Sequence, residues 1–257
     1  MAATVGQILD IVNEIAPPEL AESYDNVGLL AGHPAWPVQR VLVALDLTKD
    51  VVEEAEKANA QLILTHHPIF FRGRKNIRED DTEGEAVCAL IRSRLAMIAA
   101  HTNFDNAEPG VNDALAEALG LKNVEAGPHG LRIGTLEKNL SPQAFARYVE
   151  EQLDTHARLY AASDRLIRRV AVLGGAGGVF WEEARELGAD GFVTGEVSHH
   201  EALAACGQSL CMVEAGHYET EHIAIKLLAG RLQERCDALQ YNVTVIESGR
   251  MPYLRQT

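Results

Sequence analysis

Residues 41–46 read VLVALD, an apolar and β-branched run that is typical of a strand buried on both faces. A helical segment follows at residues 51–58, and residues 61–65 (QLILT) form a second apolar run. Alternating strands and helices predict parallel pairing, because a helix supplies the crossover that parallel strands need. This stretch therefore predicts an α/β fold.

The same order of elements recurs in the second half of the chain. VAVL at residues 170–173, a helical segment at 181–187 and GFVT at 191–194 repeat the strand, helix and strand. Adding 129 to the residue numbers 41–65 gives 170–194 without a gap. A match of this length favours duplication of one α/β unit.

The repeat predicts two related α/β units with mostly parallel sheets. We place the first unit at residues 1–125 and the second at 126–257, because GPHG at residues 127–130 has the composition of a loop. The C-terminal helix and strand can pack back on the first unit. Further elements are predicted as strands at 97–100, 132–136, 209–213 and 243–247 and as a helix at 220–235.

Composition and charge narrow the class of protein. The chain has 257 residues and a formal net charge of -14, which argues against binding to nucleic acid or to anionic membranes. No apolar run approaches the roughly 20 residues of a membrane span, and residues 1–14 lack a basic signal-peptide region. We expect a cytoplasmic protein whose four cysteines are reduced and pack as small apolar groups.

Candidate ligand groups follow three of the predicted strands. Ligands of open α/β sheets gather at the carboxyl ends of strands. Imidazole and carboxylate groups stand at these ends: His66 and His67, then His101 and Asp105, then His217 and Glu221. Such groups suit zinc, iron, manganese or nickel.

Spacing gives each candidate two readings. His66 and His67 are adjacent, so in an extended chain they point to opposite sides and would serve two neighbouring metal ions, or one would bind while the other packs. His217 and Glu221 lie one helical turn apart on one face, which suits metal binding, although an acid in a first turn also complements the helix dipole. Asp105 alone reads equally as a turn-forming aspartate.

Four motifs together carry a resemblance to a known family. They are DNVGL at residues 25–29, LTHHP at 64–68, HTNFD at 101–105 and GHYETE at 216–221. In order and spacing they resemble the Nif-three-like family, many of whose members are named GTP cyclohydrolase 1 type 2 homologues. The resemblance spans about residues 4–245. It implies two similar α/β domains, a dinuclear metal site in the cleft between them and a ring-shaped homohexamer.

The resemblance also implies which residues bind metal. The family's ligands fall on His66, His67, Asp105, His217 and Glu221, and together they would hold two divalent ions. Glu221 would bridge the ions, Asp105 and one histidine of the pair would complete one site, and His217 and the other histidine would complete the second. Tyr24 replaces the family's usual tryptophan, a departure that leaves the ligands unchanged.

Other positions have weaker support. Asp25 and Asn26 could orient a substrate or close a turn, and His101 could transfer protons or be a buried, hydrogen-bonded histidine. His199 and His200 could face the site or the surface. The glycine-rich residues 174–178 follow a strand as a phosphate cradle does, but lack the lysine and hydroxyl of a P-loop, so a tight turn is favoured.

A metal-dependent hydrolase of a small heterocyclic or phosphorylated substrate is the favoured function. The family name suggests a nucleotide, GTP, opened with release of formate. Other metal-dependent phosphoesterases or amidohydrolases would use the same ions, and a non-catalytic metal-binding adaptor is the alternative from another class. The same ligand set serves several metals and several classes of substrate.

Overall fold

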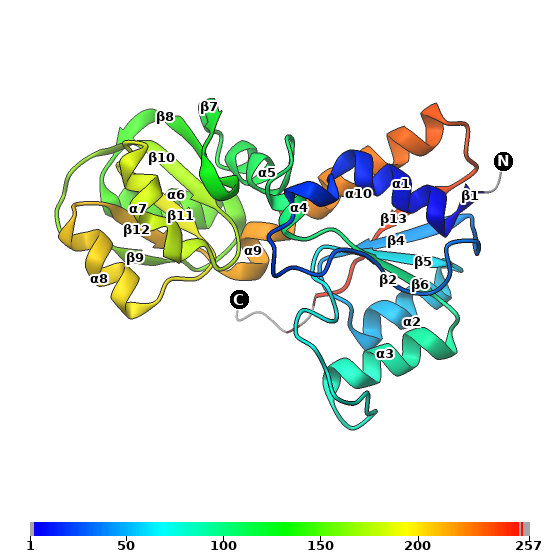
Figure 1. Ribbon diagram of the computed structural model, residues 1–257. Coiled ribbons are helices and arrows are strands. Elements are labelled where there is room, and N and C mark those ends of the chain that lie inside the picture. Colours follow the sequence, from blue (N-terminus) through cyan, green and yellow to red (C-terminus); the bar gives the residue numbers. More distant parts are fainter. Residues whose placement is uncertain (1–2, 252, 254–257) are drawn as a thin grey trace. The chain divides into compact units, whose positions relative to one another are not determined.

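The computed structural model of the chain describes residues 3–251 and 253, and they divide into two compact units. The first unit comprises residues 1–107 and 225–257, and the second comprises residues 108–224. The second unit therefore begins earlier than the boundary that the sequence suggested between residues 125 and 126. The C-terminal strand, residues 244–247, is red in Figure 1 and pairs with residues 40–43 of the first unit.

The first unit is built on a five-stranded sheet. Its strand order is β13-β4-β5-β6-β2, and only the β2–β6 pair is antiparallel. The strands are β2 (Gly28–Ala31), β4 (Arg40–Ala44), β5 (Leu62–Thr65), β6 (Ala96–Ala99) and β13 (Thr244–Glu247). The strands β4, β5 and β6 are almost entirely buried, as their continuous apolar sequences predict.

Helices cover both faces of this sheet. On one face, α2 (Lys49–Lys57) and α3 (Thr82–Arg92) bury Val51, Val52 and Leu90 against the strands. On the other face lie α1 (Val5–Ile15) and α10 (Ile223–Ala238) (Figure 1). The shorter elements of the unit are β1 (Ala3–Thr4), η1 (Pro18–Leu20), β3 (Pro37–Val38) and α4 (Thr102–Asp105).

The second unit is built on a six-stranded mixed sheet. Its strand order is β7-β8-β10-β11-β12-β9, and β10, β11 and β12 pair in parallel while the outer strands are antiparallel. The strands are β7 (Lys122–Ala126), β8 (Arg132–Leu140), β9 (Arg158–Tyr160), β10 (Ile167–Leu173), β11 (Gly191–Thr194) and β12 (Cys211–Glu214).

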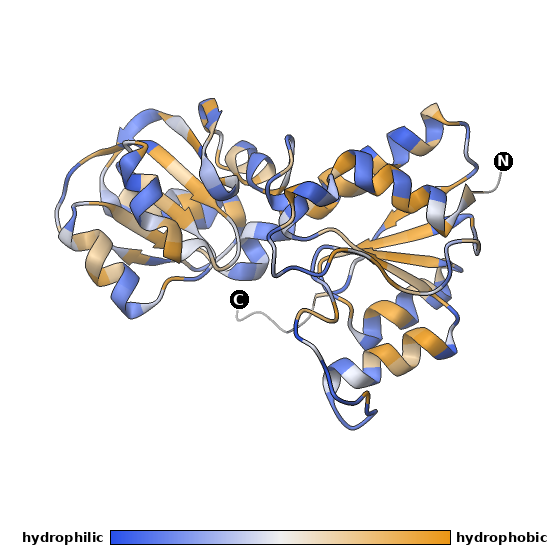
Figure 2. Ribbon diagram, viewed as in Figure 1, coloured by the Kyte–Doolittle hydropathy of each residue, from blue (hydrophilic) through white to orange (hydrophobic). Residues whose placement is uncertain are grey.

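Two apolar clusters join this sheet to its helices. One packs α5 (Val111–Ala118) and α6 (Pro142–Leu153) on one face, and the other packs α7 (Trp181–Glu186) and α8 (His199–Gly207) on the opposite face. Figure 2 shows the apolar residues concentrated in the strands. The remaining elements are η2 (Pro128–Gly130), η3 (Gly177–Phe180) and α9 (His217–Glu221).

The predicted internal repeat corresponds to an identical strand register in the two units. In the first unit Val41 pairs with Leu62 and Ala44 with Thr65. In the second unit the residues 129 positions later pair in the same way, from Val170 with Gly191 to Leu173 with Thr194. The α/β fold class predicted from the sequence is confirmed.

One predicted element differs in detail. The helix expected at residues 220–235 is two helices, α9 and α10, that are separated at His222. The apolar periodicity of residues 223–232 predicted α10 and gave no sign of the separate short helix α9. Across residues 3–251, no helix combines the length and the apolar character of a membrane span.

Candidate metal centre

The histidine pair of the first unit continues the strand β5. The backbone N–H groups of His66 and His67 donate to the carbonyl oxygens of Ala44 and Leu45, at 3.2 and 2.9 Å, so the chain stays beside the end of β4 for two residues after β5 ends. Their ring centroids nevertheless lie only 4.9 Å apart. The two imidazoles therefore remain close at the carboxyl end of the strand.

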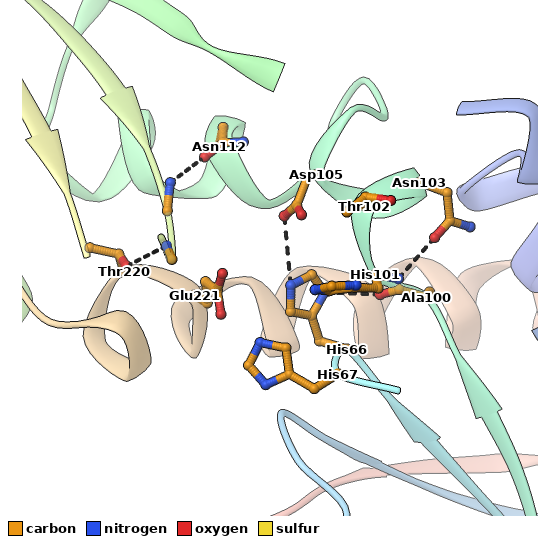
Figure 3. A network of polar contacts seen from close by, with 12 residues as sticks. His66, His67, Ala100, His101, Thr102, Asn103, Asp105, Asn112, Thr220 and Glu221 are labelled. Atoms are coloured by element: carbon orange, nitrogen blue, oxygen red, sulfur yellow. Dashed lines mark hydrogen bonds and ion pairs between the residues drawn. The ribbon is translucent and has the colours of Figure 1, made fainter. Parts of the chain in front are cut away.

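His66 is the buried member of the pair, with 1% of its surface exposed. Its Nδ1 lies 2.9 Å from the carbonyl oxygen of Ala100, which can only accept, so Nδ1 carries the hydrogen. Its Nε2 lies 3.6 Å from Oδ1 of Asp105, which the short helix α4 presents (Figure 3). Nε2 is thus the nitrogen available to a metal ion beside a carboxylate.

His67 and His101 are oriented by carboxylates. Nδ1 of His67 donates to Asp46 at 2.8 Å, and Nδ1 of His101 donates to Asp25 at 2.9 Å. One ligand nitrogen from each of His66, His67 and His101 can be chosen so that all lie within 4.8 Å of one another. The first unit alone therefore brings together three imidazoles and the Asp105 carboxylate.

Asp25 is held by several donors in the first unit. Its side chain is fully buried, and it accepts hydrogen bonds from His101, from the backbone of Asn26 and from the backbone and hydroxyl of Thr102. Burial alone would raise the pKa of the Asp25 carboxyl, but the hydrogen bonds from His101 and Thr102 outweigh it and hold that pKa well below its usual range. Asp25 is therefore an anion that fixes His101 and the start of α4.

Asn26 has a different contact. Its side-chain amide donates to the carbonyl oxygen of Phe70 at 2.9 Å and so fixes the loop that comes after the histidine pair. Contact of Asp25 or Asn26 with a substrate stays a prediction.

The second unit carries its own histidine and carboxylate on α9. Nδ1 of His217 donates to Glu196 at 2.7 Å, and its Nε2 lies 3.0 Å from Oε2 of Glu221. Glu221 is 5% exposed. A buried carboxylate needs cationic or hydrogen-bonding partners to remain charged, and a divalent ion would be one. His217 and Glu221 share one face of α9, as their spacing of four residues predicts.

The glycine-rich turn of the second unit packs against these two side chains. Gly175 has φ +62°, and a Cβ there would lie 2.2 Å from Oε1 of Glu221 and 3.2 Å from Nε2 of His217. The backbone N–H groups of Gly174 and Gly175 donate to the side-chain oxygens of Asn112 and Thr220, at 2.8 and 3.1 Å (Figure 3). These N–H groups are already used within the protein, so the tight-turn reading is favoured over the phosphate cradle.

The donor set fits divalent transition-metal ions. Nδ1 is bonded to an oxygen in four histidines, so Nε2 is the nitrogen of each ring that could bind a metal. These histidines are His66, His67, His101 and His217. Metal-ligating histidines in proteins almost always have this second hydrogen bond. Imidazole nitrogens and carboxylates suit zinc, iron, manganese or nickel.

Comparison with known proteins identifies the family. A family model described as DUF34/NIF3 (NGG1p interacting factor 3) matches residues 3–252. The chain belongs to the DUF34/NIF3 family. The predicted resemblance is thereby confirmed.

Relatives of the NIF3 family match over nearly the full length. Proteins named GTP cyclohydrolase 1 type 2 homolog are 31% identical in Clostridium acetobutylicum, over 96% of both chains, and 34% identical in Streptomyces coelicolor, over 94% of this chain and 90% of the relative. Two solved structures, a Bacillus cereus protein related to NIF3 and a Staphylococcus aureus hypothetical protein, each match with a TM-score of 0.93. They are 27% and 26% identical, with 99% and 100% of both chains covered.

Two other groups of residues lie apart from the ligand clusters. His199 and His200 are exposed at the start of α8, which favours their reading as surface residues. The four cysteines are free thiols, and burial raises the pKa of Cys211 to about 12 and that of Cys236 to about 11. Such thiols stay protonated and act as small apolar groups.

Sequence reasoning missed the residues that orient the candidate ligands His67 and His217. Asp46 lies just after β4, and Glu196 stands 129 positions after His67, so it occupies the same place after β11. Both strand-end positions were visible in the sequence. The internal repeat could have indicated Glu196, because Glu196 follows β11 at the position that His67 has after β5.

Proposed function

We propose that this NIF3-family protein is a metal-dependent hydrolase with two divalent ions held by His66, His67, Asp105, His217 and Glu221. In this proposal Glu221 would hold both ions, and Asp105 and one histidine of the pair would hold one of them. His217 and the other histidine of the pair would hold the second ion. Three of the proposed ligands, His66, His67 and Asp105, belong to the first unit, and His217 and Glu221 belong to the second.

The observation that supports the proposal most is that the histidines of both units are hydrogen-bonded through the same ring nitrogen, Nδ1. In both units Nδ1 donates to an oxygen of the protein, at 2.7 to 2.9 Å. Such bonds fix the ring and raise the basicity of Nε2, and they are typical of metal ligands.

Bound divalent ions would supply Lewis-acid chemistry, polarising the substrate and lowering the pKa of water. The chain's own residues would complete the reaction. His101 lies beside His66 and His67, with ring centroids 5.2 and 5.5 Å away, and is our candidate to donate a proton to the leaving group. Asp25 accepts the hydrogen bond from Nδ1 of His101, and this bond keeps Nε2 of His101 directed away from Asp25.

The substrate is proposed from the names of the relatives. Several are named GTP cyclohydrolase 1 type 2 homolog, and such a reaction on GTP opens the imidazole ring and releases formate. A phosphoesterase or an amidohydrolase would use the same ligand set, because a metal pair does not fix the substrate.

Formate release tests the cyclohydrolase proposal. The metal-loaded protein is incubated with GTP, and formate is measured against a Glu221→Ala variant. His199→Ala, an exposed histidine of α8, is the matched control and should behave as the unmodified protein. Formate at the level of the Glu221→Ala variant would reject the cyclohydrolase activity and leave other hydrolases to be assayed.

A non-catalytic adaptor is the second candidate, because the family description names an interacting factor. The two candidates differ in coordination: an enzyme needs a position open to water, whereas a structural site is closed by protein ligands. Water-proton relaxation of the Mn²⁺-loaded protein separates them. Strong enhancement of relaxation supports the hydrolase, and its absence supports the adaptor.

We also propose that the protein is a homohexamer, as the family resemblance implies. Light scattering coupled to size-exclusion chromatography checks this. A mass near six times the chain mass of 28.0 kDa is expected, and a monomer or dimer mass would contradict it.

A further inference from the structure

The connection after the histidine pair distinguishes the first unit from the second. Residues 66–81 join β5 to α3, whereas residues 195–198 join β11 to α8, so sixteen residues stand where the other unit has four. Long irregular connections in compact domains are often binding loops. This loop begins at the candidate metal ligands His66 and His67.

Both ends of the loop are fixed to the first unit. Near its start, Asn26 donates to the carbonyl oxygen of Phe70. Near its end, Arg74 donates to both carboxylate oxygens of Asp81 at 2.8 Å and pairs with Glu83, at the start of α3. Residues 75–80 therefore lie between two positions, Arg74 and Asp81, that are tied to each other.

A shallow cavity, largely open to solvent, lies within the loop. Its volume is about 480 Å³, and it is lined by Phe70, Arg74, Lys75, Asn76 and Ile77. That volume falls in the usual range for small-molecule sites, roughly 300–1,000 Å³. Phe70 and Ile77 supply apolar surface, and the other lining residues supply cationic and amide donors. This combination suits a ligand that has an anionic group.

Lys75 is the cation of this cavity that remains accessible. Arg74 is engaged by Asp81 and Glu83, and Arg78 pairs with Asp80. Lys75 is exposed, and within the part of the chain that the structure describes its ammonium group forms no ion pair. The chain has a net charge of -14, so the ammonium group of Lys75 is a local positive charge that attracts a small anion.

The same loop reaches the candidate proton donor. The ring of Phe71 lies 5.7 Å from that of His101 at 89°, and 6.1 Å from that of Tyr24. Tyr24 is 64% exposed and Phe71 is 44% exposed. Exposed aromatic rings beside His101 offer a surface against which a planar heterocycle can pack.

We propose that residues 70–77 form the substrate subsite and bind a nucleoside phosphate. Lys75 and Asn76 hold the phosphate, and Phe71 and Tyr24 contact the base. A small nucleotide is favoured over RNA, because the strongly acidic chain repels a polyanion. This assignment rests on the proposed hydrolase function, since it places the base beside His101.

Calorimetric titration of the metal-loaded protein tests the subsite. GTP, inorganic triphosphate and guanosine are the probes, and GTP should bind more tightly than guanosine. Lys75→Ala should weaken GTP and triphosphate binding roughly 10- to 100-fold, as expected for a charge-assisted hydrogen bond, and leave guanosine unchanged. Lys75→Arg should restore most of the affinity.

Lys57→Ala is the matched control, because Lys57 is an exposed lysine of α2 in the same unit. Equal GTP affinity for the Lys75→Ala and Lys57→Ala variants would overturn the proposal. So would equal affinity of the unmodified protein for GTP and guanosine, or tighter binding of a single-stranded RNA that depends on Lys75.

The same titration on metal-free protein separates this inference from the proposed function. If the chain binds no ions but GTP affinity still depends on Lys75, the hydrolase proposal fails and the phosphate subsite stands. If the ions bind and the Lys75 variant has no effect, the subsite fails and the metal centre stands.

Discussion

The two α/β units share a strand register but carry different residues at the carboxyl ends of their strands. Adding 129 to the positions after β4 and β5 places Asp46 on Gly175, His66 on Gly195 and His67 on Glu196. The first unit has imidazoles and an orienting carboxylate at these places, and the second has glycines and a carboxylate.

Each unit therefore assembles its candidate ligand groups in a different way. In the first, His66 and His67 come from the end of β5 itself. In the second, His217 and Glu221 come from α9, and the glycines at the strand ends leave room for them. A duplicated scaffold can thus keep its strand pairing while its loop residues diverge, because pairing depends on the buried strands alone.

The glycine turn of the second unit gives the largest expected effect. Gly175→Ala places a methyl group 2.2 Å from Glu221 and adds the strain of φ +62°. Gly188→Ala has a comparable positive φ, +83°, but nothing within 4 Å of the new Cβ. We expect Gly188→Ala to lower the free energy of unfolding by about 1 kcal/mol and Gly175→Ala by about 2–4 kcal/mol.

Urea unfolding of the two variants measures the difference, and metal analysis shows whether Glu221 is displaced. Gly175→Ala should also lose bound metal, whereas Gly188→Ala should keep it. Equal stability and equal metal content in both variants would contradict the close packing of Gly175 against Glu221.

The first unit should be the more sensitive to acid through Asp25. The pKa of Asp25 is lowered in the folded state, so its ionised form stabilises the fold at neutral pH. That contribution is complete above the unfolded pKa, about 3.9, and is lost as the pH falls below it toward the folded pKa. Asp25→Asn should remove the contribution and cost about 1–3 kcal/mol at pH 7.

Urea unfolding between pH 7 and pH 2.5 checks this expectation. The gap in stability between the unmodified protein and Asp25→Asn should be widest at neutral pH and should narrow below about pH 4. A gap that stays constant across this range would mean that the charge of Asp25 does not stabilise the fold.

The orienting carboxylates of the two units give the smallest expected effect. Asp46 bonds to His67 and is 35% exposed, whereas Glu196 bonds to His217 and is 58% exposed. Removing such a partner typically weakens metal binding about 10- to 100-fold. The loss of metal affinity should be near the upper end of this range for Asp46→Asn and near the lower end for Glu196→Gln. Solvent screens the more exposed pair, Glu196 and His217, more strongly.

Competition with a chromophoric chelator measures the two affinities on purified variants. Glu83→Gln, a change in an exposed residue of α3, serves as the control. A larger loss for Glu196→Gln than for Asp46→Asn would reverse the comparison between the units.

The sequence predicted the parts of the fold that depend on local pattern. The apolar runs at β4, β5, β10 and β11 are buried strands, and their repeat at 129 residues matches the observed register. The histidine pair at the end of β5 was also visible, because it comes directly after an apolar run.

Other features depend on contacts between distant residues. Asp25 bonds to Thr102 across 77 positions, and Gly175 to Thr220 across 45, and no periodicity marks such pairs. The boundary between the units was also misplaced at the loop of residues 127–130, because a loop composition alone does not show which sheet the neighbouring strands join. β7 joins the second sheet through β8.

The number of metal ions per chain tests the central claim most directly. Native mass spectrometry and elemental analysis of the metal-loaded protein should give two ions per chain. The His66→Ala and His217→Ala variants, which alter one unit each, should each retain fewer than two. A chain that binds no ions even after titration with zinc, iron, manganese or nickel would contradict the claim that these histidines and acids form a metal centre.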